Sequence, residues 1–234
     1  MLVVPVLDLM AGHVVHARRG DRSTYRPLES KLTSSSEPIA VIGALLALAP
    51  FDTVYVADLD AILRRGHHRH VLDGIQAEFP ALGLWLDAGF AEPGDLAPWS
   101  RARRTPVIGS ETVASIAAFA AMRAAAPEAI LSLDTRGDRQ LGPAALFDTP
   151  ELWPERVIVM TLDRVGSGGG PSLDGVRQTL DRAPGRRLIA AGGVRNATDL
   201  ERLETLGVHA ALVATAIHDG TLDRTALARG ASPG

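Results

Sequence analysis

The stretch Val54-Tyr-Val-Ala-Asp-Leu-Asp60 decides the fold, because it returns position by position as Val157-Ile-Val-Met-Thr-Leu-Asp163. Each copy is a short apolar run that ends in polar residues, which is the pattern of a parallel β-strand buried on both faces. Two further pairs of stretches keep nearly the same spacing, residues 84–90 with 188–194 and residues 107–110 with 212–215. A chance likeness does not hold one offset over several strands, so the pattern indicates an internal duplication.

Apolar runs of this kind alternate with helix-like stretches along the whole chain. We predict strands at residues 2–8, 53–60, 82–87, 105–109, 129–134, 156–162, 187–191 and 210–214. Helices are expected at residues 38–49, 111–126, 171–183, 197–206 and 222–229. Eight buried strands joined by crossover helices predict a single α/β domain, a (β/α)8 TIM barrel over residues 1–234. The repeat divides it into two similar half-barrels, about residues 1–122 and 123–234.

The composition limits the classes of function. The chain has 234 residues, a formal net charge of -3 and no cysteine. Without cysteine it has no disulfides, thiolate metal sites or cysteine nucleophiles. A small negative charge with no long basic run gives no source for non-specific nucleic-acid binding. The apolar amino terminus is too short for a membrane span or a signal peptide, so we expect a cytoplasmic protein that binds neither nucleic acid nor membrane.

Two aspartates close the first and fifth predicted strands. Asp8 ends the run Val6-Leu-Asp8, and Asp134 ends the matching run Ser132-Leu-Asp134. Functional groups of such barrels lie at the carboxyl ends of the strands. Apolar neighbours shield both carboxylates, which raises the pKa of each toward neutrality, where proton transfer is efficient. We therefore expect Asp8 and Asp134 to be a catalytic pair of base and acid, the simpler alternative being that each caps a loop or pairs with an arginine.

Glycine-rich strand ends form a second group of candidates, because bare backbone N–H groups can approach a phosphate closely. In the second half the predicted phosphate ligands are Gly192, Gly193, Ala214 and Thr215, and in the first half they are Gly89, Gly109 and Ser110. Gly166 and Ser167 begin a flexible run suited to a loop that closes over a ligand. Glycine also serves tight turns and plain flexible connections, which are the alternative.

The long segment after the first strand carries Arg18, Arg19, Arg22 and Arg26. An arginine on such a loop can clamp an anion through two parallel hydrogen bonds, and we count Arg19 among the phosphate ligands. A solvated surface loop is the alternative interpretation of the cluster.

Three histidines, His67, His68 and His70, suggest a metal site at first sight. They lack the i, i+4 spacing and the accompanying carboxylate of a zinc-binding helix, and the neighbouring arginines repel a cation. We therefore expect no metal there.

Several of these stretches together resemble one known family. They are Val6-Leu-Asp-Leu-Met-Ala-Gly12, Gly20-Asp21, Val56-Ala-Asp-Leu-Asp60, Ser132-Leu-Asp134, Gly170-Pro171 and Ala191-Gly-Gly-Val194. Over essentially its whole length the chain resembles the histidine-biosynthesis half-barrel family, in particular its aminoaldose–aminoketose (ProFAR) isomerase branch. The resemblance implies an Amadori rearrangement of a substrate with a phosphate at each end, without metal or cofactor. By position, Asp8 would be the general base and Asp134 the general acid. Ser167 would take the place of the threonine in the family's Asp-Gly-Thr motif, which assists the reaction.

The sequence departs from the family pattern at two phosphate motifs. The run Asp87-Ala-Gly-Phe-Ala91 places an acid and no arginine where the family has a Gly-Gly-Gly-Ile-Arg motif. In the second half, Ala214-Thr215 stands where the family has a glycine followed by lysine or threonine. The cyclase branch of the family is not excluded by an aspartate at the first strand. The arginine-rich loop resembles that of a divergent group of related proteins from methanogens and methylotrophs. The genes of these proteins often lie beside genes for one-carbon, tetrahydromethanopterin-type cofactors. A paralogue in that metabolism and a non-catalytic phosphate-ligand-binding barrel are therefore the alternatives.

The expected partner is a small phosphorylated molecule, and we expect a monomer or a weak homo-oligomer.

Overall fold

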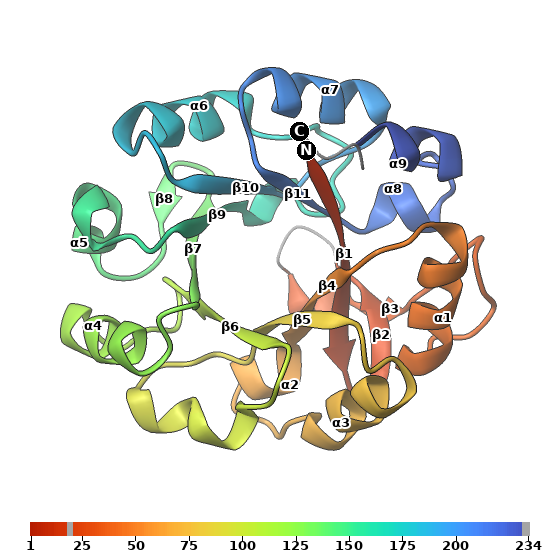
Figure 1. Ribbon diagram of the computed structural model, residues 1–234, viewed down its shortest axis with the longest axis horizontal. Coiled ribbons are helices and arrows are strands. Elements are labelled where there is room, and N and C mark those ends of the chain that lie inside the picture. Colours follow the sequence, from red (N-terminus) through yellow and green to blue (C-terminus); the bar gives the residue numbers. More distant parts are fainter. Residues whose placement is uncertain (18–20, 231–234) are drawn as a thin grey trace.

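Eight parallel strands form a closed ring in this computed structural model, which describes residues 1–17 and 21–230. In ring order the strands are β1 (Leu2–Met10), β4 (Thr53–Asp58), β5 (Gly83–Asp87), β6 (Arg104–Gly109), β7 (Ile130–Arg136), β9 (Arg156–Thr161), β10 (Arg187–Ala191) and β11 (Ala210–Val213). The ring closes because β11 pairs in parallel with β1 (Figure 1). The predicted (β/α)8 TIM barrel is therefore confirmed.

Helices surround the ring of strands (Figure 1). They are α1 (Pro38–Leu48), α2 (Leu59–Ile62), α3 (Arg69–Glu78), α4 (Ile116–Ala125), α5 (Ala144–Asp148), α6 (Leu173–Arg182), α7 (Ala197–Thr205), α8 (Thr215–His218) and α9 (Arg224–Gly230). Side-chain caps fix several starts. The Ser115 hydroxyl accepts the Ala118 N–H at 3.0 Å, so α4 begins at Ile116, later than the predicted residue 111. Asp58 caps α2 in the same way, which ends β4 two residues before the predicted 60.

The strands bury their two faces in different cores. Side chains such as Val4, Tyr55 and Trp85 fill the inside of the barrel. The alternate residues of the same strands, such as Leu7 and Val56, pack outward against the helices. This alternation follows from the two-residue repeat of a strand. It means that every second residue of a strand points toward the barrel axis.

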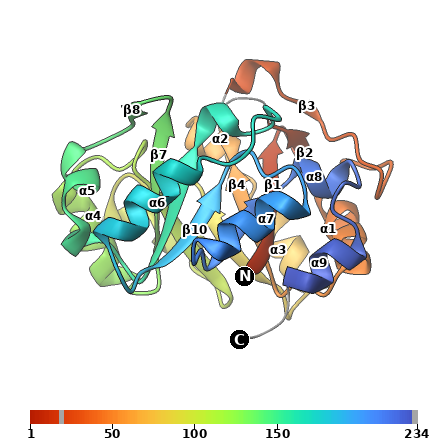
Figure 2. The ribbon, with the colours of Figure 1, turned by 90° about the horizontal axis from the view of Figure 1, so that it is seen from above.

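Short antiparallel strands extend one end of the barrel. The strand β2 (His13–His16) pairs with the end of β1, and β3 (Arg26–Pro27) pairs with β2. On the fifth barrel strand, β8 (Arg139–Gln140) pairs with β7 in the same way. Figure 2 shows β2, β3 and β8 along the same edge of the molecule, opposite to the amino terminus. The segment after β1 therefore lies over the carboxyl ends of the strands.

None of the helices in the described part of the chain is both long and apolar enough to cross a membrane. The division into two half-barrels stays a prediction.

Candidate active site

A cavity of about 400 Å³ opens at the carboxyl ends of the strands. Its charged lining comes from several elements and includes Asp8, Arg22, Asp87, Glu111 and Asp134. Glycines of the loops after β9 and β10 line it as well. This is the end of the barrel at which enzymes of this architecture carry their active sites.

The two-residue alternation of the strands brings three aspartates into this cavity. Asp8 follows Val4 and Val6 on the inner face of β1, and Asp87 follows Trp85 on β5. Asp134 follows Ile130 on β7 by the same alternation. Asp87 is the last residue of β5, whereas β1 and β7 each continue for two residues beyond their aspartate. The predicted pair, Asp8 and Asp134, thus lines one cavity together with a third acid.

Asp134 is buried and firmly held. Its Oδ1 accepts the Ser132 hydroxyl at 2.6 Å, and its Oδ2 accepts the Glu111 backbone N–H at 3.1 Å and the Ser110 hydroxyl at 3.3 Å. Burial is the largest influence and raises its pKa to about 7, although the Ser132 hydrogen bond opposes the shift. The carboxyl group therefore exchanges a proton near neutrality from a fixed position.

Asp8 differs from Asp134 in having no hydrogen-bond donor within residues 1–17 and 21–230. Burial raises the pKa of Asp8 to about 7, against the opposing charge of Arg22, and the charge of Asp87 adds to the rise. Asp8 pairs with Ala57 across β1 and β4, and Ala57 pairs with Asp87, so the two acids stand at one level of the barrel. A carboxylate without internal donors keeps its oxygens available to a ligand.

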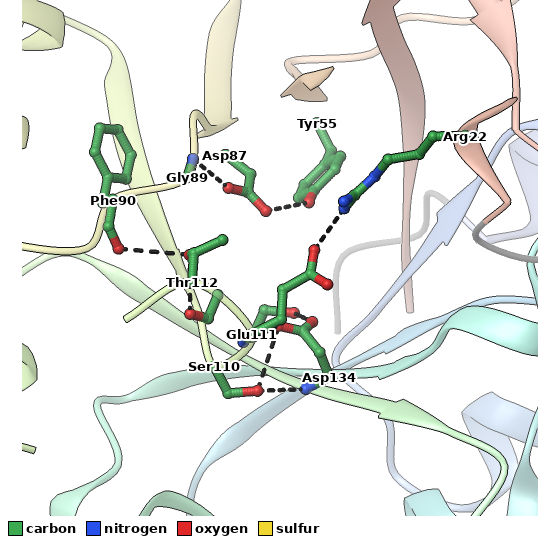
Figure 3. Close-up of polar contacts among 11 residues, drawn as sticks. Arg22, Tyr55, Asp87, Gly89, Phe90, Ser110, Glu111, Thr112 and Asp134 are labelled. Carbon is green, nitrogen blue, oxygen red and sulfur yellow. Dashed lines mark hydrogen bonds and ion pairs between the residues drawn. The ribbon is translucent and has the colours of Figure 1, made fainter. Parts of the chain in front are cut away.

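Asp87 completes the set, although it was not among the residues predicted from the sequence. Its Oδ1 accepts the Gly89 N–H at 3.0 Å, and its Oδ2 lies 3.4 Å from the Tyr55 hydroxyl, which donates to it (Figure 3). Burial raises the pKa of Asp87 to about 6, against the Gly89 hydrogen bond, and the charge of Glu111 adds to the rise. The signal that could have identified Asp87 was its place two residues after the inward Trp85.

One arginine of the long loop reaches the acids. The Arg22 guanidinium lies 2.6 Å from Glu111 Oε1, and both side chains are partly buried (Figure 3). Tyr25, on the same loop, also lines the cavity, and burial raises its pKa to about 12. Arg26 instead donates to the carbonyls of its own loop. Arg18 and the predicted ligand Arg19 lie outside the described residues.

The glycines after β10 are required by the backbone itself. Gly192 and Gly193 both have positive φ. A Cβ on Gly192 would lie 2.6 Å from the Thr161 carbonyl oxygen, and one on Gly193 would lie 2.3 Å from the Gly170 carbonyl oxygen. Glycine therefore lets these loops approach each other closely at the cavity wall. The Gly193 N–H meets no acceptor in the described part of the chain.

The predicted phosphate ligands fall into two groups. Those of the second half line the cavity, namely Gly166, Gly192, Gly193, Ala214 and Thr215. Gly89, Gly109, Ser110 and Ser167 are not part of its wall. Ser110 is fully buried, and its hydroxyl bonds to Asp134. The Ser167 hydroxyl donates to the Arg164 carbonyl oxygen at 2.9 Å. Phosphate binding by either group stays a prediction.

The histidine cluster has a structural use. The His68 N–H donates to Asp58 Oδ2 at 2.6 Å, and its Nδ1 lies 2.9 Å from Asp58 Oδ1. The Gly12 N–H donates to His68 Nε2 at 2.9 Å, which places the ring proton on Nδ1. His68 therefore ties the turn after β1 to the end of β4. Among residues 1–17 and 21–230, no group of three or more His, Asp or Glu side chains is placed to hold a metal ion.

Comparison with known proteins extends over nearly the whole chain. Residues 2–223 match the model of a family described as histidine biosynthesis protein. An uncharacterised protein of Methanocaldococcus jannaschii is 28% identical over 95% of this chain and 96% of its own length. An imidazole-4-carboxamide isomerase of Halorhodospira halophila, whose name specifies two phosphoribosyl groups, is 26% identical over 95% of this chain and 94% of its own. A protein of Pelotomaculum thermopropionicum with the same name is 26% identical over 95% of this chain and 89% of its own.

Fold, site position and family match agree, and the chain belongs to the histidine biosynthesis protein family.

Proposed function

We propose that this chain is an aldose–ketose isomerase that carries out an Amadori rearrangement of a phosphorylated aminosugar. The observation that carries the proposal is the pair Asp8 and Asp134, which line one cavity from opposite sides of the barrel, each with a pKa of about 7. Of two carboxyl groups with such pKa values, one can be ionised at neutral pH and act as a base while the other is protonated and acts as an acid. Two of the relatives are named as isomerases, which supports the same class of reaction.

The two aspartates suit different proton transfers. In the proposed reaction Asp134 gives a proton to the ring oxygen of the aminoaldose, and the bond from that oxygen to C1 breaks as a C1–N double bond forms. Asp8 then takes the proton from C2, and the resulting enaminol becomes the aminoketose as its C2 hydroxyl loses a proton and C1 gains one. Asp8 suits the base because no donor in the described part of the chain holds its oxygens. Asp134 suits the acid because Ser110, Ser132 and the Glu111 N–H fix its position.

The glycine-rich side of the same cavity is the proposed place of a substrate phosphate. Gly166, Gly192, Gly193 and Thr215 line it, and the Gly193 N–H has no acceptor among the described residues. A phosphate there would receive backbone N–H groups, which bind anions without needing a charged side chain. These contacts would hold the phosphate end of the substrate while its sugar ring reaches the two aspartates.

A second candidate is the same chemistry on a different phosphorylated substrate, including one from one-carbon cofactor metabolism. The observation that favours it is the presence of Asp87 and Glu111 at the cavity wall, because both would repel a phosphate beside β5 and β6. The Methanocaldococcus jannaschii relative, which has no named activity, leaves room for such a substrate.

Turnover of the substrate named for the isomerases tests the first candidate. On the first candidate, the purified chain converts it to the ketose, which nuclear magnetic resonance follows, and Asp8→Asn lowers kcat by at least about 1,000-fold. Asp138→Asn is the matched control, because Asp138 is an exposed acid on the turn after β7. If the folded wild-type chain leaves this substrate unchanged but isomerises another aminoaldose phosphate through Asp8, the second candidate replaces the first. Full wild-type activity in Asp8→Asn would contradict both, and would leave a non-catalytic role for this aspartate.

A further inference from the structure

The side of the cavity next to β5 and β6 is acidic. Asp87 ends β5, Glu111 follows β6, and Asp134 lies on the neighbouring β7. Among residues 1–17 and 21–230, Arg22 faces them and is held by Glu111 at 2.6 Å. The charges of Asp87 and Glu111 both raise the pKa of Asp134, which shows that the acids repel one another. An anion placed here would add to this repulsion, whereas a cation would relieve it.

Two backbone donors on this side are already in use. After β5, the Gly89 N–H donates to Asp87 Oδ1 at 3.0 Å. After β6, the Glu111 N–H donates to Asp134 Oδ2 at 3.1 Å. N–H groups in such turns are the ones that a phosphate uses. Here the carboxylates of the chain itself occupy the positions in which phosphate oxygens would receive them.

Two of the carboxylates converge on the backbone of Gly109, beside the Thr112 hydroxyl. A Cβ on Gly109 would lie 3.2 Å from Asp134 Oδ2 and 3.7 Å from Asp87 Oδ2, so both oxygens face the bare backbone of Gly109. Asp87 Oδ2 receives the Tyr55 hydroxyl at 3.4 Å, near the upper limit of a hydrogen bond, which leaves capacity for another donor. A charged donor placed between Asp87, Glu111 and Asp134 would reach more than one carboxylate (Figure 3).

The opposite side of the cavity has different chemistry. Gly166, Gly192 and Gly193 line it, and the Gly193 N–H is without an acceptor in the described part of the chain. Arg136 lines the same cavity. The isomerases from Halorhodospira halophila and Pelotomaculum thermopropionicum are named for two phosphoribosyl groups. Only one side of this cavity offers a phosphate a favourable environment.

We propose that the substrate of this chain carries its phosphate on the glycine-rich side and presents a cationic group, such as a protonated amine, to Asp87 and Glu111. The proposal rests on the proposed function, since it concerns the same cavity and the substrate that lies between Asp8 and Asp134. It makes Asp87 a specificity-determining residue. A second phosphate at the acidic side is rejected, and a positive charge there is selected.

Binding of three sugar phosphates to the full chain tests this substrate class. The probes are glucosamine 6-phosphate, which has one phosphate and one amine, glucose 6-phosphate, which lacks the amine, and fructose 1,6-bisphosphate, which has two phosphates. Isothermal titration calorimetry at pH 7 gives a Kd for each. We expect glucosamine 6-phosphate to bind about tenfold more tightly than glucose 6-phosphate, and the bisphosphate to bind most weakly.

Matched variants identify the residues responsible. In Asp87→Asn the preference for the amine should fall below about threefold, whereas Asp138→Asn, which removes one exposed acid at the same end of the barrel, should keep it. Glu111→Gln gives the same measurement if Asp87→Asn does not fold. A wild-type chain that binds the amine no more tightly than glucose 6-phosphate, or prefers the bisphosphate, overturns the proposal. So does an amine preference that survives both Asp87→Asn and Glu111→Gln.

The proposed isomerase reaction can fail separately. An amine preference that depends on Asp87, together with no turnover of any aminoaldose phosphate, would reject the isomerase and keep the substrate class. Turnover of the doubly phosphorylated substrate without an amine preference would keep the isomerase and reject the substrate class.

Discussion

At the scale of single residues, the buried acids of the cavity make the stability of the fold depend on pH. Asp8 has a pKa raised from 3.8 to about 7, mainly by burial. A carboxyl group with a raised pKa in the folded state stabilises the fold fully below its unfolded pKa, and this contribution is lost as the pH rises through the folded pKa. Above pH 7 the charged form of Asp8 therefore lowers the stability of the fold.

Asp8→Asn should remove that cost. We expect the free energy of unfolding of the variant to exceed that of wild type by about 1 to 2 kcal/mol at pH 8. At pH 4 the two free energies of unfolding should be equal. The figure is below the roughly 4 kcal/mol that a shift of three units allows, because water reaches this carboxylate through the cavity. Urea unfolding at both pH values measures it. Equal effects at pH 4 and pH 8 would contradict the assignment.

Asp87 should set the pH range of the reaction. Its charge raises the pKa of Asp8 and of Asp134, so Asp87→Asn should lower both. The acid limb of the kcat/KM profile should then move to lower pH, by roughly one unit. Arg22 lowers the pKa of Asp8, so Arg22→Met should move the same limb to higher pH. The profiles are measured on an aminoaldose phosphate that wild type converts, and shifts in one direction for both variants would contradict this arrangement of charges.

The sequence predicted Asp8 and Asp134 because both end strongly apolar strands, which place the last inward residue at the mouth of a barrel. Asp87 satisfies the same rule, two residues after Trp85. It was interpreted only as a departure from a phosphate motif, since its partners are Tyr55 on β4 and Glu111 after β6, both far from it in the sequence. Contacts of this kind depend on the register between strands, which one sequence does not reveal.

At the scale of elements, His68 joins two loops at the mouth of the barrel. It bonds to Asp58 at the end of β4 and accepts the Gly12 N–H from the turn after β1. His68→Ala leaves the buried Asp58 carboxylate with fewer donors and should lower the free energy of unfolding by about 2 to 3 kcal/mol. His67→Ala is the control, because His67 is exposed, and it should cost less than about 0.5 kcal/mol. Urea unfolding of both variants measures the difference, and equal losses would contradict the structural role.

The loops after β9 and β10 give a second test at this scale. Gly168 and Gly193 both have positive φ, but a Cβ on Gly168 meets nothing within 4 Å, whereas one on Gly193 would lie 2.3 Å from the Gly170 carbonyl oxygen. Gly168→Ala should therefore cost about 1 kcal/mol of stability, and Gly193→Ala about 3 kcal/mol. Thermal unfolding compares them. Similar losses would show that the close approach of the two loops does not constrain Gly193.

The elements with strong periodic or apolar signals were predicted from sequence, and the short ones were not. The eight barrel strands were found because parallel strands buried on both faces leave long apolar runs. The two-residue strands β3 and β8 leave no such signal. The helix α3 was missed because it begins within a polar, histidine-rich stretch. The start of α4 was placed early, at residue 111, because the cap at Ser115 was not recognised in the sequence.

At the scale of the whole molecule, the inner core connects the two parts of the sequence repeat. Its members come from both, with Val4, Tyr55, Trp85 and Val107 from the first part and Ile130, Ile158, Ile189 and Ala210 from the second. Arg156 of β9 also lies over the Trp85 ring of β5, 5.6 Å from its centroid. The repeat was readable from the sequence, but this shared core was not, because the repeat alone does not say whether two halves close on each other or stand apart.

A shared core predicts that the chain unfolds as one unit. A variant whose only tryptophan is Trp85 reports on the first part of the repeat, and one whose only tryptophan is Trp153 reports on the second. We expect their fluorescence transitions in urea to coincide with each other and with the loss of helical circular dichroism, since neither part can keep its inner face buried alone. Separate midpoints for the two variants, with a plateau between them, would instead show that the part around Trp85 and the part around Trp153 hold their structure independently.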